Sequence, residues 1–266
     1  ASLPASLSLL DGVGSSINHR FAALVAGSHY RTFDNSITES PFAAVHQVPA
    51  AHFIMSGHNG NFYSDSYWRL QITDLGTNNE DLLAEQYREL LFNSVRRRLA
   101  VAERPAFTLS GGMDSSSVLC SATSITGYPQ AAFSSVYVDP TYDERNEISD
   151  VIDAGLANWN PVELPEDMDI LSIIQRLVQV HNEPVATATW LAHDYICQSV
   201  SKAGYRSLFG GLGGDELNAG EYEYFPLFFA DLQHTGNILQ LDREIETWAF
   251  HHDHPIHHKN KDIAHD

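Results

Sequence analysis

The stretch AFTLSGGMDSSSVLCSATSIT, residues 106–126, is the part of the chain that most clearly predicts the fold. Its first residues, Ala106–Leu109, form a short apolar run directly after Pro105, and such a run predicts a buried strand. Two glycines and several hydroxyl residues follow. Apolar residues then recur at helical spacing over Ser115–Thr126. The stretch therefore predicts a strand, a tight turn and a helix.

Strand and helix patterns alternate through the rest of the chain. Further strands are expected at Ala131–Val138, Pro161–Leu164 and Tyr205–Phe209, and further helices at Asp143–Leu156, Ile170–Val178 and Trp190–Ala203. Alternation of this kind predicts an α/β fold, a doubly wound parallel sheet with helices on both faces. Ligands of such sheets bind at the carboxyl ends of the strands.

The first 75 residues have a different pattern. Short extended pieces are expected at Ala51–Met55, Gly60–Ser64 and Tyr67–Leu70, and the Asn59-Gly60 pair predicts a tight hairpin. A helix should then begin at Asn78 or Asn79, which can cap it, and end near Leu99. We therefore expect a short β-rich segment at 1–75 and an α/β domain at 76–266.

Composition excludes several classes of protein. The chain has 266 residues, and its 15 Lys and Arg against 34 Asp and Glu give a formal net charge of −19. The one dense cationic cluster is Arg96–Arg98, so we expect no nucleic-acid partner. No apolar run approaches the roughly 18 residues of a membrane span, so we expect no membrane partner. Cys120 and Cys197 lie in apolar helical patterns and outside any C-x-x-C, which predicts buried, reduced thiols of a cytoplasmic protein.

The loop between the first strand and helix can hold an anion. Gly111 and Gly112 allow backbone N–H groups to approach a ligand, and the following helix points its N-terminus at the same place. The serines in this loop add hydroxyl donors. Asp114 would repel a bare phosphate, but it suits a divalent metal that holds the phosphates. A plain Gly-Gly turn with helix caps remains the alternative on these residues alone.

A second glycine cluster, Gly210–Gly214, also follows a predicted strand and ends in Asp215-Glu216. If the two strands are neighbours, Asp114 and Asp215 can share one Mg²⁺, because a few carboxylates plus phosphates are the usual Mg²⁺ ligands. Glu216 could instead be a simple neighbour of the metal ligand.

These residues resemble a known family. Residues 110–116, SGGMDSS, resemble the pyrophosphate loop of ATP-pyrophosphatases. Together with 210–217, GGLGGDEL, and Asp143-Glu144, they look like the synthetase domain of the asparagine synthetase family. Residues 40–45, 48–53 and Tyr67-Trp68 look like the end of its glutaminase domain. The resemblance covers roughly residues 40–225. It implies that 1–75 is a remnant of a glutaminase-like domain and that 76–266 is an ATP-binding synthetase-like domain, incomplete at its C-terminal end.

The resemblance implies ATP-dependent amide formation: adenylation of a small-molecule carboxylate, release of pyrophosphate, and displacement of AMP by an amine or ammonia. A homodimer or a glutaminase partner is possible. The implied nucleotide-binding residues are Leu109, Ser110, Gly111, Gly112, Asp114, Ser115, Ser116, Val138, Gly210 and Gly211, and the implied Mg²⁺ ligands are Asp114 and Asp215. No catalytic residue is assigned.

Three departures from the family pattern keep another function open. Leu212 stands where asparagine synthetases have a glutamate, which favours an amide product other than asparagine. The N-terminal cysteine of the family's glutaminase is absent, and the only lysines after the second loop are Lys259 and Lys261. The alternative is a nucleotide-binding pseudoenzyme or subunit that keeps the ATP cradle without ligase chemistry. A tRNA-modifying ATP-pyrophosphatase would need a basic face.

Weaker features each have two interpretations. Asp143 and Glu144 could cap a helix or contact the nucleotide or substrate. Asn182-Glu183-Pro184 could stop a helix or lie near the substrate, and Arg96–Arg98 could be a solvated helix end or an anion site. The run His251–His258 is expected to be a tail with at most adventitious zinc binding, because Pro255 breaks regular ligand spacing.

Overall fold

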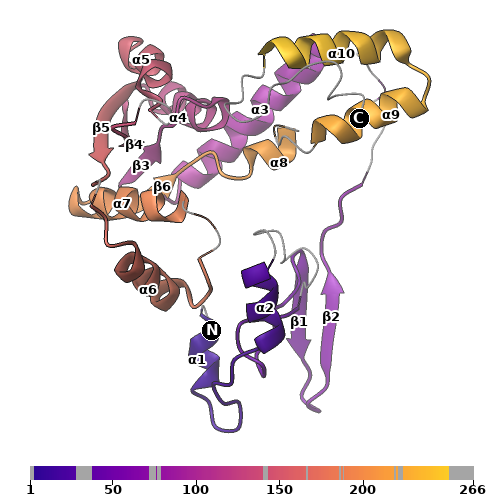
Figure 1. Cartoon of the computed structure of the whole chain (residues 1–266), viewed down its shortest axis with the longest axis vertical. Helices are drawn as coiled ribbons and strands as arrows, with labels where there is room; N and C mark the ends of the chain where they lie inside the picture. The colour runs from indigo at the N-terminus through magenta and orange to yellow at the C-terminus, as the bar shows by residue number, and fades with distance from the viewer. Residues whose placement is uncertain are drawn as a thin grey trace.

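A four-stranded parallel sheet with the strand order β5-β4-β3-β6 is the centre of the larger part of the molecule (Figure 1). The structure, a computed structural model, describes residues 3–27, 38–71, 76, 79–139, 143–165, 167–185, 187, 189–218, 220 and 224–251. The strands are β3 (Pro105–Thr108), β4 (Gln130–Val136), β5 (Ala157–Glu163) and β6 (Ser207–Phe209). This sheet confirms the predicted α/β class.

Helices precede and connect these strands, and several of them have clear end caps. The helices are α3 (Glu80–Leu99), α4 (Met113–Thr126), α5 (Arg145–Asp153), α6 (Ile170–His181) and α7 (Thr189–Lys202). Asn79 caps α3 by accepting a hydrogen bond from the backbone N–H of Leu82 at 3.1 Å. Gly127 ends α4 in the left-handed conformation with φ +79°. The predicted cap Asn78 lies outside the described residues.

Both faces of the sheet are covered by helices. Successive side chains of a strand point to opposite faces, so Phe107 and Ala106 of β3 enter different clusters. The first cluster joins the sheet to α3, α4 and α5, and Phe107 and Leu119 in it are fully buried. The second joins the sheet to α7 through Ile196 and Val200. The doubly wound arrangement follows from these two apolar faces.

The predicted strand at Pro161–Leu164 begins too late, because β5 starts at Ala157. It pairs with β4 over its whole length, from Gln130↔Ala157 to Val136↔Glu163. β5 is the edge of the sheet, and its burial alternates only in part, because Asn160 and Pro161 are both exposed. The exposed asparagines of this strand weaken the apolar pattern that predicts strands.

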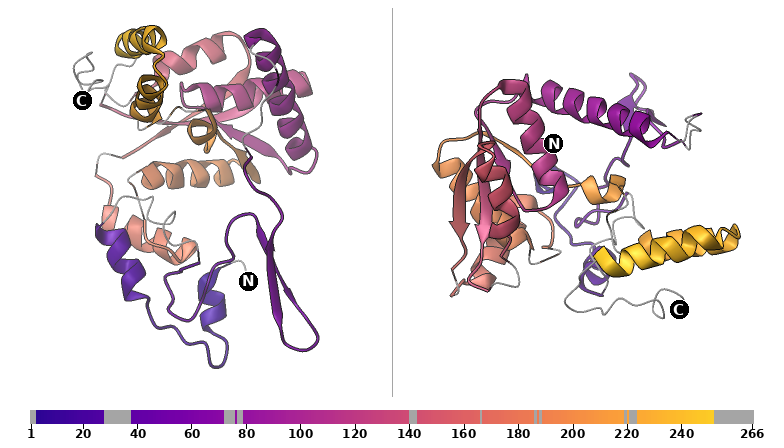
Figure 2. Two further views of the ribbon diagram at one scale, coloured as in Figure 1. Left: turned by 90° about the vertical axis from the view of Figure 1, so that its right-hand side faces the viewer. Right: turned by 90° about the horizontal axis from the view of Figure 1, so that it is seen from above.

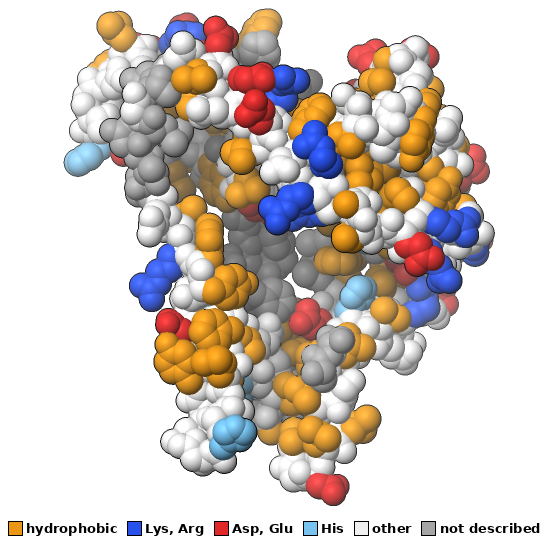
Figure 3. Space-filling view, turned by 180° about the vertical axis from the view of Figure 1, so that it is seen from behind, with side chains coloured by type: hydrophobic (Ala, Val, Ile, Leu, Met, Phe, Trp, Pro, Cys, Tyr) orange, Lys and Arg blue, Asp and Glu red, His pale blue; other side chains and the backbone are white. Residues whose placement is uncertain are grey.

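The N-terminal segment contains the predicted hairpin and two helices that the sequence did not predict. The helices are α1 (Pro4–Ser8) and α2 (His19–Gly27), and the antiparallel strands are β1 (His52–Ser56) and β2 (Phe62–Ser66). Tyr67–Leu70, predicted as extended, is not part of a strand. Figure 3 shows hydrophobic side chains gathered on the hairpin, where Phe62 is 77% exposed.

Three more helices follow β6, and the sequence did not predict them. They are α8 (Gly214–Asn218), α9 (Tyr224–His234) and α10 (Ile238–His251). α9 and α10 pack on each other through a cluster of their own that includes Phe229, Ile245 and Trp248. The right-hand view in Figure 2 shows α10 standing away from the sheet. The boundary at 75 stays a prediction.

Two further expectations concern cysteines and membranes. Both cysteines are free thiols, but Cys197 is exposed and Cys120 only half-buried, so the predicted burial is wrong for Cys197. Cys197 lies on α7 between Ile196 and Val200, which pack on the sheet, but its own side chain is exposed. In the described part of the chain, no helix is both long and apolar enough to cross a bilayer.

Candidate functional site

The two glycine loops lie side by side at the carboxyl edge of the sheet. β3 and β6 are adjacent and parallel, with Pro105 opposite Ser207 and Phe107 opposite Phe209, so the loops that follow them leave the same edge. The strand order also reverses here, since β4 and β5 lie on one side of β3 and β6 on the other (Figure 1). Doubly wound sheets bind ligands at such a point.

A hydrogen-bonded serine pair shapes the first loop, Leu109–Gly112. The Ser115 hydroxyl accepts a hydrogen bond from the backbone N–H of Ser110 at 3.0 Å and lies 2.9 Å from the Ser110 hydroxyl. It also donates to the carbonyl of Gly112 at 3.3 Å. Ser115 is buried, and its contacts hold the loop back against the start of α4. Binding of a phosphate by the Ser115 hydroxyl would compete with these bonds, and this contact stays a prediction.

The N-terminus of α4 opens toward this loop. Gly112 is its N-cap in an extended conformation, and it makes no side-chain cap. The first N–H groups of a helix have no partner within the helix, so they are available to an anion. Ser116 lies in the same first turn, half-buried, while Ser110 is exposed. The predicted cradle therefore has backbone and hydroxyl donors on one side of the loop.

The second loop packs directly on the first. A Cβ added to Gly211 would lie 2.6 Å from the backbone nitrogen of Ser115 and 2.8 Å from the Cβ of Asp114. A Cβ added to Gly214 would lie 2.2 Å from the Cγ of Asp114. These contacts are possible only without side chains. The glycines thus bring the carboxylate of Asp114 against the residue that precedes Asp215.

Gly210 and Val138 border the same edge. A Cβ on Gly210 would lie 2.8 Å from the Oγ1 of Thr108, so the second loop begins tightly against β3. Val138, which follows β4, is 76% exposed and open to a ligand. Leu109, by contrast, is 1% exposed, and its side chain lies in the sheet core. The predicted contacts of these residues with adenosine stay predictions.

The two carboxylates predicted to hold Mg²⁺ lie in the first turns of α4 and α8, and their role as ligands stays a prediction. Among the described residues, neither Asp114 nor Asp215 has a hydrogen-bond or ion-pair partner for its side chain, and no group of three or more His, Cys, Asp or Glu could hold a metal. Asp114 is half-buried and Asp215 exposed. Two unpaired carboxylates are too few for a metal site of protein ligands alone, but they suit Mg²⁺ that also binds phosphate oxygens.

The start of α5 closes the first loop from the other side. A Cβ added to Gly111 would lie 2.1 Å from the Cβ of Glu147. Burial, and then the nearby charge of Glu147, raises the pKa of Glu144. Asp143 forms an ion pair with Arg145 at 3.3 Å. Glu144 makes no side-chain cap, so the capping interpretation loses support for this residue.

Leu212 stands at the tip of the second loop and is 88% exposed. Its side chain can neither accept nor donate a proton. Glu216, on α8, is exposed as well. The tip thus offers an apolar group where the family pattern has a carboxylate.

Other predicted features have simpler roles. Asn182 ends α6 in the left-handed conformation with φ +59°, so the helix-stop interpretation is confirmed. Arg96–Arg98 occupy the last turn of α3 and are exposed, as a solvated helix end predicts. Lys259, Lys261 and His252–His258 lie outside the described residues.

The sequence did not single out the residues that support the loops from behind. The Ser134 hydroxyl donates to the carbonyl of Leu109, and the indole N–H of Trp159 donates to Ser134 at 3.0 Å. A buried serine within an apolar strand usually has a hydrogen-bond partner. The position of Ser134 in such a strand could therefore have predicted its bond to a neighbouring element. The sequence pattern around Glu147 predicts nothing of this kind, because its contact with Gly111 is between elements that are distant in the sequence.

The chain matches a model of a known protein family. The family model described as asparagine synthase matches residues 86–252, which include both glycine loops. No curated protein matches the chain.

Proposed function

The chain belongs to the asparagine synthase family, and from this premise we propose that it joins a small-molecule carboxylate to an amine at the expense of ATP. The contact between Gly214 and the Asp114 carboxylate supports the proposal most directly. It brings together two loops that lie about 100 residues apart in the sequence, and a ligand larger than a single phosphate can contact both of them.

In the first step, a carboxylate oxygen of the substrate attacks the α-phosphorus of ATP. The bond from this phosphorus to the bridging oxygen breaks, and pyrophosphate leaves with that electron pair. The first loop and the N-terminus of α4 would bind and orient the departing pyrophosphate. Asp114 and Asp215 would hold Mg²⁺, which supplies charge neutralisation on the phosphates.

In the second step, an amine nitrogen attacks the acyl carbon, and the C–O bond to AMP breaks. The nitrogen loses a proton, which a nearby base must accept. Glu144 is a candidate, because it precedes α5, whose Glu147 packs against Gly111 of the first loop, and because burial and the charge of Glu147 raise its pKa. Leu212 cannot serve in this way, so we propose an amide product other than asparagine.

The second candidate function is nucleotide binding without ligase chemistry. The exposed Leu212 supports it, because the loop tip presents no ionisable group.

Pyrophosphate exchange separates the two functions. The full chain is incubated with ATP, Mg²⁺, labelled pyrophosphate and a panel of carboxylic acids. We expect label to enter ATP only with a suitable acid, because reversal of adenylation regenerates ATP. Saturable ATP binding without exchange for any acid would instead establish the nucleotide-binding alternative.

A further inference from the structure

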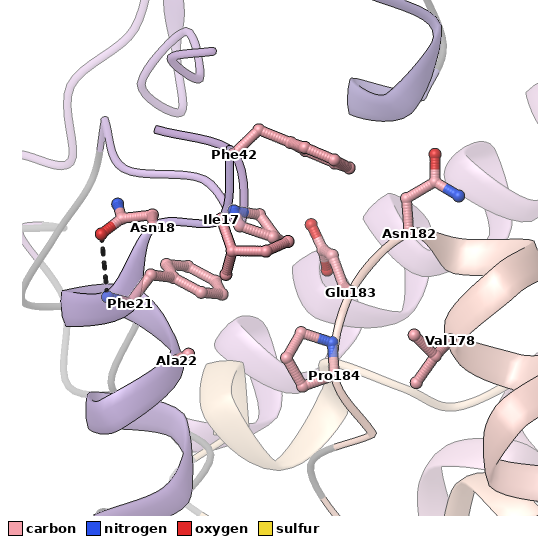
Figure 4. A pocket seen from close by; sticks show the side chains of 10 residues that line it. Ile17, Asn18, Phe21, Ala22, Phe42, Val178, Asn182, Glu183 and Pro184 are labelled. Atoms are coloured by element: carbon pink, nitrogen blue, oxygen red, sulfur yellow. Dashed lines mark hydrogen bonds between the residues drawn. The ribbon is translucent and has the colours of Figure 1, made fainter. Parts of the chain in front are cut away.

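Two features of the molecule take no part in the proposed reaction. One is a cavity of about 260 Å³ between the N-terminal segment and the end of α6, with Phe21 and Phe42 on one side and Val178 and Pro184 on the other (Figure 4). Its lining is almost entirely apolar, so it offers little by which a ligand could be recognised. The other is the edge of the sheet at which β3 and β6 begin, here called the amino edge.

The amino edge carries positive charge in a chain that is strongly acidic. Segments 96–104 and 202–206, which lead from α3 into β3 and from α7 into β6, contain six Lys or Arg and one Asp or Glu. The whole chain has a formal net charge of −19. The helix dipole stabilises a cation near the C-terminal end of a helix, which accounts for those in the last turns of α3 and α7. It does not account for Arg104 and Arg206, which come just before the strands.

Arg104 and Arg206 come together at the start of two adjacent strands. β3 and β6 are parallel, and the backbone N–H of Arg206 donates to the carbonyl of Arg104 at 3.1 Å. Side chains of a strand alternate, so Arg206 is on the same side of the sheet as Leu208, which packs with α7. Arg104 is on that side too, because its guanidinium group lies next to Gly204, which follows α7. Like charges that are neighbours across two strands destabilise a sheet unless an anion binds both.

The backbone around Arg104 holds its side chain in place. A Cβ added to Gly204 would lie 2.7 Å from the Nη2 and 3.2 Å from the Nη1 of Arg104, so the guanidinium group rests against this glycine. Arg104 itself has φ +46°, which is uncommon for a residue other than glycine. Among the described residues, the guanidinium groups of Arg104 and Arg206 have no hydrogen-bond or ion-pair partner, and both residues are exposed. Their donors are therefore available to a ligand.

The exposure of these groups favours one kind of ligand. A guanidinium group binds a carboxylate or a phosphate through two parallel hydrogen bonds. Solvent screens its attraction for a small free anion, whereas a chain with several carboxylates can bind both arginines at once. A nucleic-acid backbone would continue beyond these few cations onto an acidic protein. We propose that the amino edge, with Arg104 and Arg206 at its centre, is a docking surface for an acidic segment of a partner protein.

This surface is independent of the proposed reaction. β3 and β6 begin at the amino edge and end at the glycine loops, so a partner docked at the amino edge leaves the nucleotide site open. The test contains no nucleotide, and its outcome therefore does not depend on pyrophosphate exchange.

The experiment measures the fluorescence anisotropy of a rhodamine-labelled hexaglutamate peptide titrated with the full chain, with labelled hexaglutamine as the uncharged reference. We expect only hexaglutamate to bind, and at least about fivefold more weakly at about 200 mM salt than at about 50 mM. Since the chain as a whole repels polyanions, such binding reports on the local cations.

Two variants locate the binding. Arg206→Gln should weaken the binding of hexaglutamate at least about fivefold. Arg104→Gly should weaken it as much and keep the melting temperature, because glycine adopts a positive φ without strain. Arg243→Gln is the matched control: it removes an exposed cation of α10, which stands away from the sheet (Figure 2), and should bind as the unmodified chain does.

No binding of hexaglutamate, or equal binding of hexaglutamine, would overturn the proposal. An equal loss in Arg243→Gln would also overturn it, because the peptide would then respond to net charge alone. Tighter binding of a labelled hexathymidylate than of hexaglutamate would overturn it in favour of a nucleic acid. The comparison of the two peptides needs no variant, so a folding defect in either arginine variant leaves the test decisive.

Discussion

At the scale of single residues, two glycines allow the two loops to pack closely because they have no side chain. Gly211 and Gly214 lie so close to the first turn of α4 that any Cβ would collide with Asp114 or Ser115. Glycine is commonly explained by its backbone freedom, but neither residue has the positive φ that would require it. Close approach of two loops is therefore the physical reason for glycine at these two positions.

Gly214→Ala tests this contact. The new Cβ would lie 2.2 Å from the Asp114 Cγ, so the carboxylate must move, whereas alanine suits the first residue of α8. We expect Mg²⁺-dependent ATP affinity to fall at least about tenfold, or 1.4 kcal/mol. The melting temperature should change by only a few degrees.

Gly27→Ala is the matched control, because a Cβ at the end of α2 meets nothing within 4 Å. Calorimetric titration with Mg-ATP measures both variants. Unchanged affinity in Gly214→Ala would mean that the position of the Asp114 carboxylate is unimportant to nucleotide binding.

At the scale of elements, α6 and α7 are joined by a charged contact. Arg176 of α6 donates to both carboxylate oxygens of Asp194 on α7, and Gln198 donates to the same carboxylate at 2.8 Å. The bond to Arg176 is the main cause of the lowered pKa of Asp194. Because the Arg176 side chain is 43% exposed, solvent screens the pair, and we expect it to contribute about 1 kcal/mol.

Asp194→Asn should therefore lower the free energy of unfolding by about 1 kcal/mol at pH 7. The pKa of Asp194 is lower in the folded state than the unfolded value near 3.8, so its contribution is present above that value. It is lost as the pH falls through the folded pKa, and the difference between variant and parent should shrink there. Urea unfolding at several pH values measures this.

Asp153→Asn, an exposed change at the end of α5, should leave the unfolding free energy within about 0.5 kcal/mol of the parent. A loss in Asp194→Asn that persists undiminished at acid pH would show that the cause is packing and not charge.

Periodicity predicted the elements around the sheet but not all of the others. α3 and α6 carry apolar residues at regular spacing and have side-chain caps at their N-termini, so local sequence is sufficient for them. α8 has five residues and lies inside a glycine-rich run, where helix propensity is low. Pro226 lies in the first turn of α9. Proline in a sequence usually argues against a helix, although the first turn tolerates it.

At the scale of the whole molecule, strand order brings the two glycine loops together, because β3 and β6 are adjacent and parallel. The sequence predicted the two loops and their carboxylates. It could predict that the loops lie close together only on the condition that β3 and β6 are neighbours. No local pattern encodes this adjacency, because it results from packing α4 and α7 on opposite faces. The support from Trp159 and Glu147 could not be predicted for the same reason, since each side chain contacts a different element.

The central claim is that Asp114 and Asp215 hold one cation between the two loops. Their coupling can be measured by titrating Mg-ATP into the parent, Asp114→Asn, Asp215→Asn and the double variant, with Asp143→Asn as control. Asp143 is paired with Arg145, so its loss should change the affinity by less than about threefold.

If the two carboxylates share an ion, each single variant should lose at least about thirtyfold in affinity, or 2 kcal/mol. The double variant should lose little more than either single one, because the same ion is already released. Additive losses, or losses no larger than that of Asp143→Asn, would contradict a shared ion.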